Sequence, residues 1–297
     1  MEHQLFKAIV AVLDQLGKPR FDPREDFTDH DIVRAYYWAV IHDRPTTWAL
    51  RPKHWPPHLR RSLRLPSDST LSRRLRSPSV TALLTRLEER VLRPKELGLY
   101  WMIDGKPLVI GGCSKDRQAG YGRAAAGKAK GYKLHALINF QGEVAGWRLA
   151  PMNTDERVMA VRLVKAAPEQ VQGYVVTDSN YDSNPLHAVC EARERGRLQL
   201  VNRRRYGSGH GHGHRKQTAG RMRSKELLEN PYPAFGEQLV ADRAQVERYF
   251  GGLVNWGGGL TGLPAWVRTH RRVHRWVQAK LVLAALKRRL PERTCDA

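Results

Sequence analysis

The chain has 297 residues and carries 51 Lys and Arg against 29 Asp and Glu, a formal net charge of +22. This balance indicates a polyanionic partner, most simply nucleic acid, although it does not separate an enzyme from a packaging or ribosomal protein. With 41% hydrophobic residues the chain can bury a core of one large domain or two ordinary ones, which excludes a disordered basic tail.

The first 95 residues show helical spacing of apolar side chains. Helices are expected over 1–16, 28–43, 66–77 and 78–92, and a Pro- and Trp-rich stretch separates the second from the third. Thr28 or Asp29 caps the second of these helices. We therefore predict a small, basic, all-helical domain at 1–95, which is the better candidate for DNA binding.

The periodicity changes after residue 95. Strands are expected over 97–112, 131–140, 143–151, 173–178 and 198–204, and helices over 154–167, 184–196, 237–254 and 266–290. A meander followed by alternating helices and strands predicts an α/β domain at 96–290, with a mixed five-stranded sheet flanked by helices and a short tail at 291–297. The apolar residues of the last helix are expected to pack on the sheet.

No feature indicates export or a membrane. Cys113, Cys190 and Cys295 have no metal-type spacing, which is typical of a reduced, intracellular protein. The N-terminus does not resemble a signal peptide, and no apolar run reaches the roughly 18 residues of a membrane span. A cytoplasmic protein without a membrane partner is expected.

Three acidic residues stand at positions where a basic chain has little reason to place them. Asp104 is expected at the end of the first strand, although Asp-Gly is also a common turn signal. Asp178 ends the strand 173–178, where a helix cap or an Asx turn is the alternative. Glu247 lies one position off the apolar stripe of its helix, where a solvent-exposed pair with Arg243 is the alternative.

Taken together, these acids predict a metal site. Chemistry in open α/β sheets gathers at the carboxyl ends of the strands, and three converging carboxylates repel one another unless a cation lies between them. Oxygen ligands select Mg²⁺ or Mn²⁺. Two such ions, roughly 3.5–4 Å apart, stabilise both the attacking and the leaving oxygen in phosphodiester displacement.

Residues about 25–290 resemble a DDE-type insertion-sequence transposase of the large group named after insertion sequences four and five. The resemblance lies in the Asp104–Gly105 pair, in KGYKLHALIN (130–139), in TDSNYDS (177–183) and in RAQVERYFGGL (243–253). STLSRRLR (69–76) is similar to the stretch that precedes the catalytic domain in this group. The chain departs from the family at Val240, often Tyr there, and at Val254, often Lys or Arg.

The resemblance implies a ribonuclease-H-like fold and cleavage and transfer of DNA strands in the bacterial cytosol or nucleoid. Asp104, Asp178 and Glu247 would be the catalytic acids and the ligands of two Mg²⁺ ions, for which Mn²⁺ substitutes. The implied partners are the terminal repeats of the element and the target DNA, bound by a homodimer or a larger oligomer.

Five basic residues are expected to contact DNA. Arg243 would orient Glu247 or contact the scissile phosphate, and Lys130 and Lys133 would contact the DNA backbone. Arg73 and Arg74 are expected to bind DNA within 66–77, a stretch that could belong to a recognition element. The HGHGH loop within 207–215 has no Cys or acid nearby to complete a zinc site, so a mobile loop near DNA is favoured.

Two alternatives remain open. A catalytically retired DNA-binding protein derived from a transposase fits Val240 and Val254, whereas the three intact acids argue against it. A structure-selective nuclease of the same fold would share the acids but not the N-terminal domain or the 243–253 helix.

Overall fold

The structure is a computed structural model that describes residues 1–17, 25–60, 64–94, 98, 100–111, 114–169, 171, 173–192, 218–229, 235, 238, 241–256, 259–260 and 262–290. The chain forms two compact units. One is helical and comprises Met1–Arg93, Leu253–Val267 and the segment from Arg271 onward. The other contains the sheet and comprises Pro94–Gly252 and Arg268–His270.

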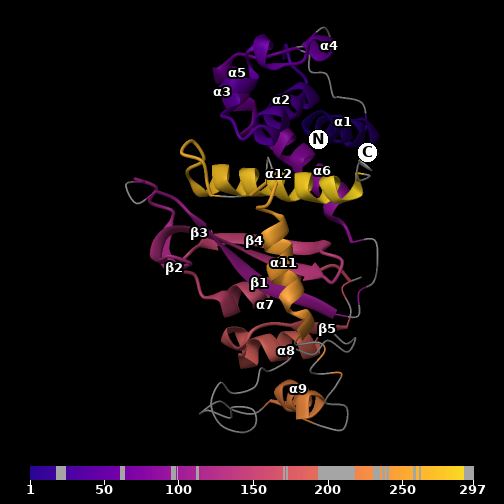
Figure 1. The fold of residues 1–297 in the computed structure, drawn as a ribbon, viewed down its shortest axis with the longest axis vertical. Coiled ribbons are helices and arrows are strands. Elements are labelled where there is room, and N and C mark those ends of the chain that lie inside the picture. The colour runs from indigo at the N-terminus through magenta and orange to yellow at the C-terminus, as the bar shows by residue number, and fades with distance from the viewer. Residues whose placement is uncertain are drawn as a thin grey trace, which may run out of the picture. The chain divides into compact units, whose positions relative to one another are not determined.

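The helical unit consists mainly of helices (Figure 1), and several of them begin at polar caps. Its N-terminal elements are α1 (Glu2–Gln15), α2 (Asp29–Ile41), α3 (Thr46–Ala49), η1 (Pro52–His54), α4 (Pro57–Arg60), α5 (Asp68–Arg74) and α6 (Pro78–Leu92). The Thr28 side chain accepts from the Asp31 N–H, and Asp31 in turn accepts from the Thr28 N–H, which makes a capping box. Ser67 and Ser77 cap α5 and α6. The helices expected in this region are confirmed.

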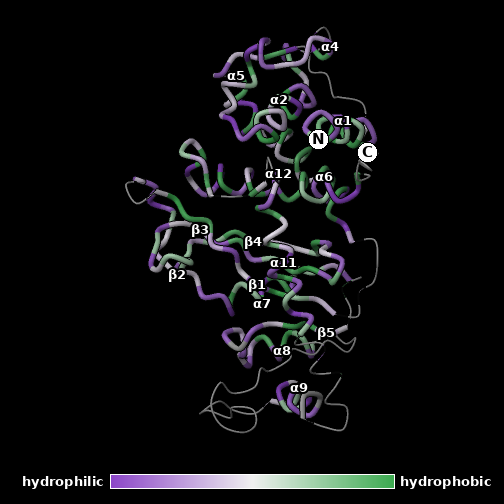
Figure 2. Tube along the Cα trace, viewed as in Figure 1, coloured by the Kyte–Doolittle hydropathy of each residue, from purple (hydrophilic) through white to green (hydrophobic). Residues whose placement is uncertain are grey.

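The last helix, α12 (His270–Arg289), belongs with these N-terminal helices from Arg271 onward. Hydrophobic and hydrophilic residues follow one another along its tube (Figure 2). The buried Lys280 ammonium lies 2.9 Å from the Val40 carbonyl oxygen and 2.5 Å from Asp43. Gln278 donates to Glu88 over 2.6 Å, and Arg289 donates to the Val91 carbonyl over 2.6 Å. These polar contacts join the helix to the helical unit, and the expectation that its apolar residues pack on the sheet stays a prediction.

The sheet unit contains a mixed five-stranded sheet. Its strands are β1 (Tyr100–Val109), β2 (Gly120–Ala124), β3 (Gly127–Asn139), β4 (Val144–Pro151) and β5 (Tyr174–Val176). The order is β2-β3-β1-β5, and β4 also pairs with β3. β3 is antiparallel to its partners, whereas β5 runs parallel to β1. This arrangement confirms the expected α/β class with a mixed sheet flanked by helices.

Alternation along the strands assigns different helices to the two faces of the sheet. Trp101, Ile103 and Leu137 form a buried cluster with residues of α7 (Glu156–Ala166) and α8 (Asn184–Ala192). Tyr100 points to the other face, because successive strand residues alternate. Its hydroxyl donates to Asp242 over 2.6 Å, just before α11 (Ala244–Gly252), and α11 contacts β1.

Several expected elements differ from the structure. β2 was not expected, while the expected strand 198–204 lies outside the described residues. The helix expected over 154–167 begins at Glu156, with Asp155 as its cap. The described helix α9 (Ala219–Glu229) is additional, and the helix expected over 237–254 is described as α11 over its later part. In the part of the chain that is described, no helix is both long and apolar enough to cross a membrane.

Candidate active site

Asp104 lies within β1 rather than at its end. The strand continues to Val109, and Asp104 is paired with Ala136 of β3. The turn alternative for Asp104–Gly105 is therefore wrong. One carboxylate oxygen accepts the N–H of Gly105 over 2.7 Å.

Asp178 follows β5 at the position that matches Asp104. The parallel pairing places Met102 opposite Val176, so the residues two positions further along each strand are Asp104 and Asp178. Asp178 also accepts the Asn180 N–H over 2.8 Å, which is an Asx turn. The turn alternative is thus real, and the charge of the same carboxylate also acts on Asp104 of β1.

The two acids interact electrostatically. Burial raises the pKa of Asp104 to about 6, and the charges of Asp178 and Glu156 act in the same direction. The Gly105 N–H and the Arg243 guanidinium act against this rise. The Asp104 carboxyl is thus a partly desolvated group next to a second carboxylate, an environment in which a cation stabilises the charged form.

Glu247 lies on α11 and forms an ion pair with Arg243. Its carboxylate is 3.5 Å from the Arg243 guanidinium, and the Glu247 side chain is 62% exposed. The Arg243 charge also acts on Asp104. Arg243 is therefore a cation shared by Glu247 and Asp104, whereas the solvent-exposed pair proposed as the alternative is also present.

The donors available here suit a hard divalent cation. Asp104 and Asp178 supply only oxygen atoms, the ligand type that Mg²⁺ and Mn²⁺ prefer. Among the described residues, no group of three or more His, Cys, Asp or Glu side chains lies close enough to hold a metal ion. The structure therefore brings Asp104 and Asp178 together and leaves Glu247 outside a three-carboxylate cluster.

Glu156 of α7 is a further acid near this pair, and the sequence analysis did not place it at the site. It forms an ion pair with Lys133 of β3, and although burial raises the pKa of Glu156, Lys133 and Tyr181 outweigh burial and lower it. An added Cβ on Gly105 would lie 2.8 Å from the Lys133 side chain, so glycine leaves room for this lysine. No local pattern in the sequence signals an ion pair between residues 23 positions apart.

The basic residues expected to contact DNA fall into two groups. Lys133 is buried and paired with Glu156, and Arg74 is buried against Glu25, Asp29 and the Phe27 carbonyl. A backbone contact to DNA by either does not fit, because both charges are used inside the fold. Arg73 is exposed, and the half-buried Lys130 donates to the Ser114 carbonyl over 2.9 Å. The loop 207–215 and Val240 lie outside the described residues.

A protein-family model described as a transposase DDE domain matches residues 101–286. The chain belongs to this family. It is a DDE transposase, an enzyme of DNA transposition, and the match spans β1, β5 and α11, which carry Asp104, Asp178 and Glu247. No curated protein is significantly similar to the chain.

Two solved transposase complexes are similar to this transposase at low identity. The piggyBac transposase synaptic complex with hairpin DNA is 10% identical, with 95% of this chain and 70% of that chain covered and a TM-score of 0.41. The Mos1 transposase paired-end complex with the left transposon end is 12% identical. The similarity covers 90% of this chain and 82% of that chain, with a TM-score of 0.24. Since both TM-scores are below 0.5, the fold assignment rests on the strand topology and the family match.

Proposed function

We propose that Asp104, Asp178 and Glu247 are the catalytic acids of this transposase and the ligands of two divalent cations, Mg²⁺ or Mn²⁺. The observation that carries the proposal is the position of the two acids: Asp104 lies on β1, and Asp178 follows the parallel neighbour β5 at the matching position. Asp104 is also partly desolvated, and the charge of Asp178 acts on it. Such a pair has a physical use for a cation, because bound positive charge relieves the repulsion between the carboxylates.

The strands supply the rigid part of the site. Asp104 in β1 and Asp178 after β5 would hold the cations from two adjacent backbone positions, and Glu247 would complete the oxygen ligands from α11. When bound, the cations would supply an activated water and stabilise the leaving 3′ oxygen. Arg243 lies just before α11, and it would position Glu247 through the ion pair between the two side chains.

The proposed reaction is cleavage at the ends of an insertion sequence, followed by attack of the freed 3′ hydroxyl on target DNA. No nucleophile from the protein is required, because water and then the DNA hydroxyl attack phosphorus. The net charge of +22 supports DNA as the partner. Arg73 and Lys130 are proposed backbone contacts, and two ends joined in one event require at least a dimer, acting in the cytoplasm.

The test is a cleavage assay on a plasmid that carries the DNA flanking the protein's own gene. We expect cuts at the element boundary with Mg²⁺ or Mn²⁺ and none with a chelator. Asp104→Asn, Asp178→Asn and Glu247→Gln should each lower the cleavage rate by roughly 100-fold or more, since metal-ion stabilisation is worth several kcal/mol.

Glu169→Gln is the matched control, because Glu169 is an exposed acid of the same unit. It should cut like the unmodified protein, and all four variants should retain binding to duplex DNA. Tight DNA binding without cleavage by the unmodified protein would instead support the retired, binding-only alternative.

A further inference from the structure

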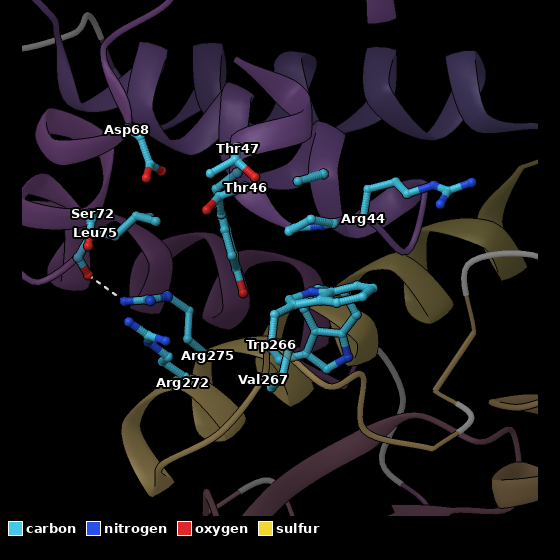
Figure 3. A pocket seen from close by; sticks show the side chains of 14 residues that line it. Arg44, Thr46, Thr47, Asp68, Ser72, Leu75, Trp266, Val267, Arg272 and Arg275 are labelled. Atoms are coloured by element: carbon cyan, nitrogen blue, oxygen red, sulfur yellow. Dashed lines mark hydrogen bonds between the residues drawn. The ribbon is translucent and has the colours of Figure 1, made fainter. Parts of the chain in front are cut away.

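The helical unit contains a pocket of about 260 Å³ that has no part in the proposed chemistry (Figure 3). It lies where α2, α3, α5 and α12 meet the segment before α12, so residues far apart in the sequence form its wall. Its lining includes two guanidinium groups of α12, the indole of Trp266 and three hydroxyl groups, and the residues that carry them are Arg272, Arg275, Trp266, Thr46, Thr47 and Ser72.

One side of the pocket is cationic. Arg272 and Arg275 are three residues apart on α12 and therefore lie on one face of the helix, and Figure 3 shows them next to each other. Arg275 is held in place, because it donates to the Leu75 carbonyl over 2.6 Å and its guanidinium lies 5.5 Å from the centre of the Tyr36 ring. Its Nε is buried without a hydrogen-bond partner. A pair of guanidinium groups matches the oxygens of a phosphate.

The other side of the pocket is aromatic. Trp266 is 40% exposed, which is unusual for the largest apolar side chain, and it lies apart from the two guanidinium groups in Figure 3. Thr46 and Thr47 lie along the wall between these sides (Figure 3). Asp68 is the single carboxylate among the lining residues, against three arginines, so the pocket is net positive.

We propose that this pocket binds an unpaired nucleotide of the DNA on which the transposase acts. Its base would stack on Trp266, and its phosphate would be bound by Arg272 and Arg275. Aromatic rings beside a cationic groove bind single-stranded DNA in this way, since every base has a π-face. A paired base cannot use the pocket, because its faces are covered by its neighbours in the duplex. The hydroxyl groups would bind polar edges of the base or sugar.

The test compares two fluorescent DNA probes by anisotropy, a blunt duplex and the same duplex with a short single-stranded overhang. The unmodified protein should bind the overhang probe more tightly. Trp266→Ala should weaken binding to that probe by roughly 5- to 150-fold, the value of one stacked base, while binding to the blunt duplex changes less than about twofold. Trp266→Phe, which keeps a ring, should retain most of the preference.

Arg272→Ala tests the phosphate contact separately. Loss of one phosphate contact on a single strand should reduce the slope of log Kd against log salt by about 0.7, whereas Trp266→Ala should leave that slope unchanged. Arg86→Ala and Tyr121→Ala, which remove an exposed arginine and an exposed aromatic ring elsewhere, should preserve the overhang preference. Thermal melting of each variant checks that it is folded.

Two results would overturn the proposal: no preference of the unmodified protein for the overhang, or a preference that survives in folded Trp266→Ala. The assay contains a chelator and measures binding alone, so it does not depend on the catalytic acids. Asp178→Asn should keep the overhang preference, which separates a failure of this pocket from a failure of the proposed metal site.

Discussion

Arg73 and Arg74 are adjacent in the sequence but serve different purposes in the structure. Arg73 is exposed on α5, whereas the Arg74 guanidinium is buried, 2.5 Å from Glu25 and 2.7 Å from Asp29. Arg74 also donates to the Phe27 carbonyl over 3.0 Å. The count of 51 Lys and Arg thus overstates the number of cations available to DNA, because arginines of this kind are paired with acids inside the fold.

The two arginines allow a matched prediction. Arg74→Ala should lower the free energy of unfolding by about 3 kcal/mol, because two carboxylates and a carbonyl lose a charged donor. Arg73→Ala should leave stability within about 0.5 kcal/mol and weaken binding to duplex DNA. Urea unfolding and DNA-binding titrations measure both effects, and equal stability of the two variants would contradict the buried role of Arg74.

At the scale of elements, β3 organises the sheet because it pairs with three other strands. Gly131 lies where β1 and the chain after β4 approach it most closely. An added Cβ there would be 2.3 Å from the Leu108 carbonyl oxygen and 3.0 Å from the Met152 sulfur. Backbone cannot move aside as a flexible side chain can, so the close packing of these strands requires glycine at this position.

We predict that Gly131→Ala lowers the free energy of unfolding by about 1–3 kcal/mol through overpacking. Gly146→Ala in β4 is the control, because its added Cβ would meet only Leu163 at 3.9 Å, an ordinary contact. The control should be neutral within about 0.5 kcal/mol. Denaturant midpoints compare the two, and equal loss in both variants would show that any Cβ in this sheet is costly.

At the scale of the whole molecule, the chain leaves the helical unit at residue 93 and returns to it after the sheet. Leu253–Val267 and α12 complete a core that the first 93 residues begin. The buried residues of α12 include Val273, Val277 and Leu281. The helical unit thus contains segments from both sides of residue 95. The division into domains at 1–95 and 96–290 remains a proposal, as does the use of one for DNA binding and the other for catalysis.

A chain that ends at His270 tests this organisation. Without α12, amide hydrogen exchange in α2 and α6 should accelerate strongly, because their contacts with Lys280, Gln278 and Arg289 and their apolar cover are removed. Exchange in β3 should stay slow. Mass spectrometry of the exchanged peptides measures the exchange rates in α2, in α6 and in β3. Faster exchange in β3 with protected α2 would contradict this organisation and would support packing of the last helix on the sheet.

Local signals in the sequence determined the helices and three main features of the site. Thr28 predicts the start of α2 because its side chain satisfies a free N–H group within three residues. The alternation in 131–140 predicts β3, and the motifs around Asp104, Asp178 and Glu247 identify the family that the match over 101–286 confirms. Each of these signals is contained in a short stretch of chain.

Contacts between distant residues were decided only by the tertiary structure. β2 has two glycines and no β-branched residue, so it forms a strand because β3 offers it backbone partners. The partners of Lys133 and Arg74 lie 23 and 45 residues away, and the pocket at Trp266 combines residues from both ends of the chain. Periodicity reports which face of an element is apolar, but not which other element covers it, so only the tertiary structure shows that α12 joins the helical unit from Arg271 onward.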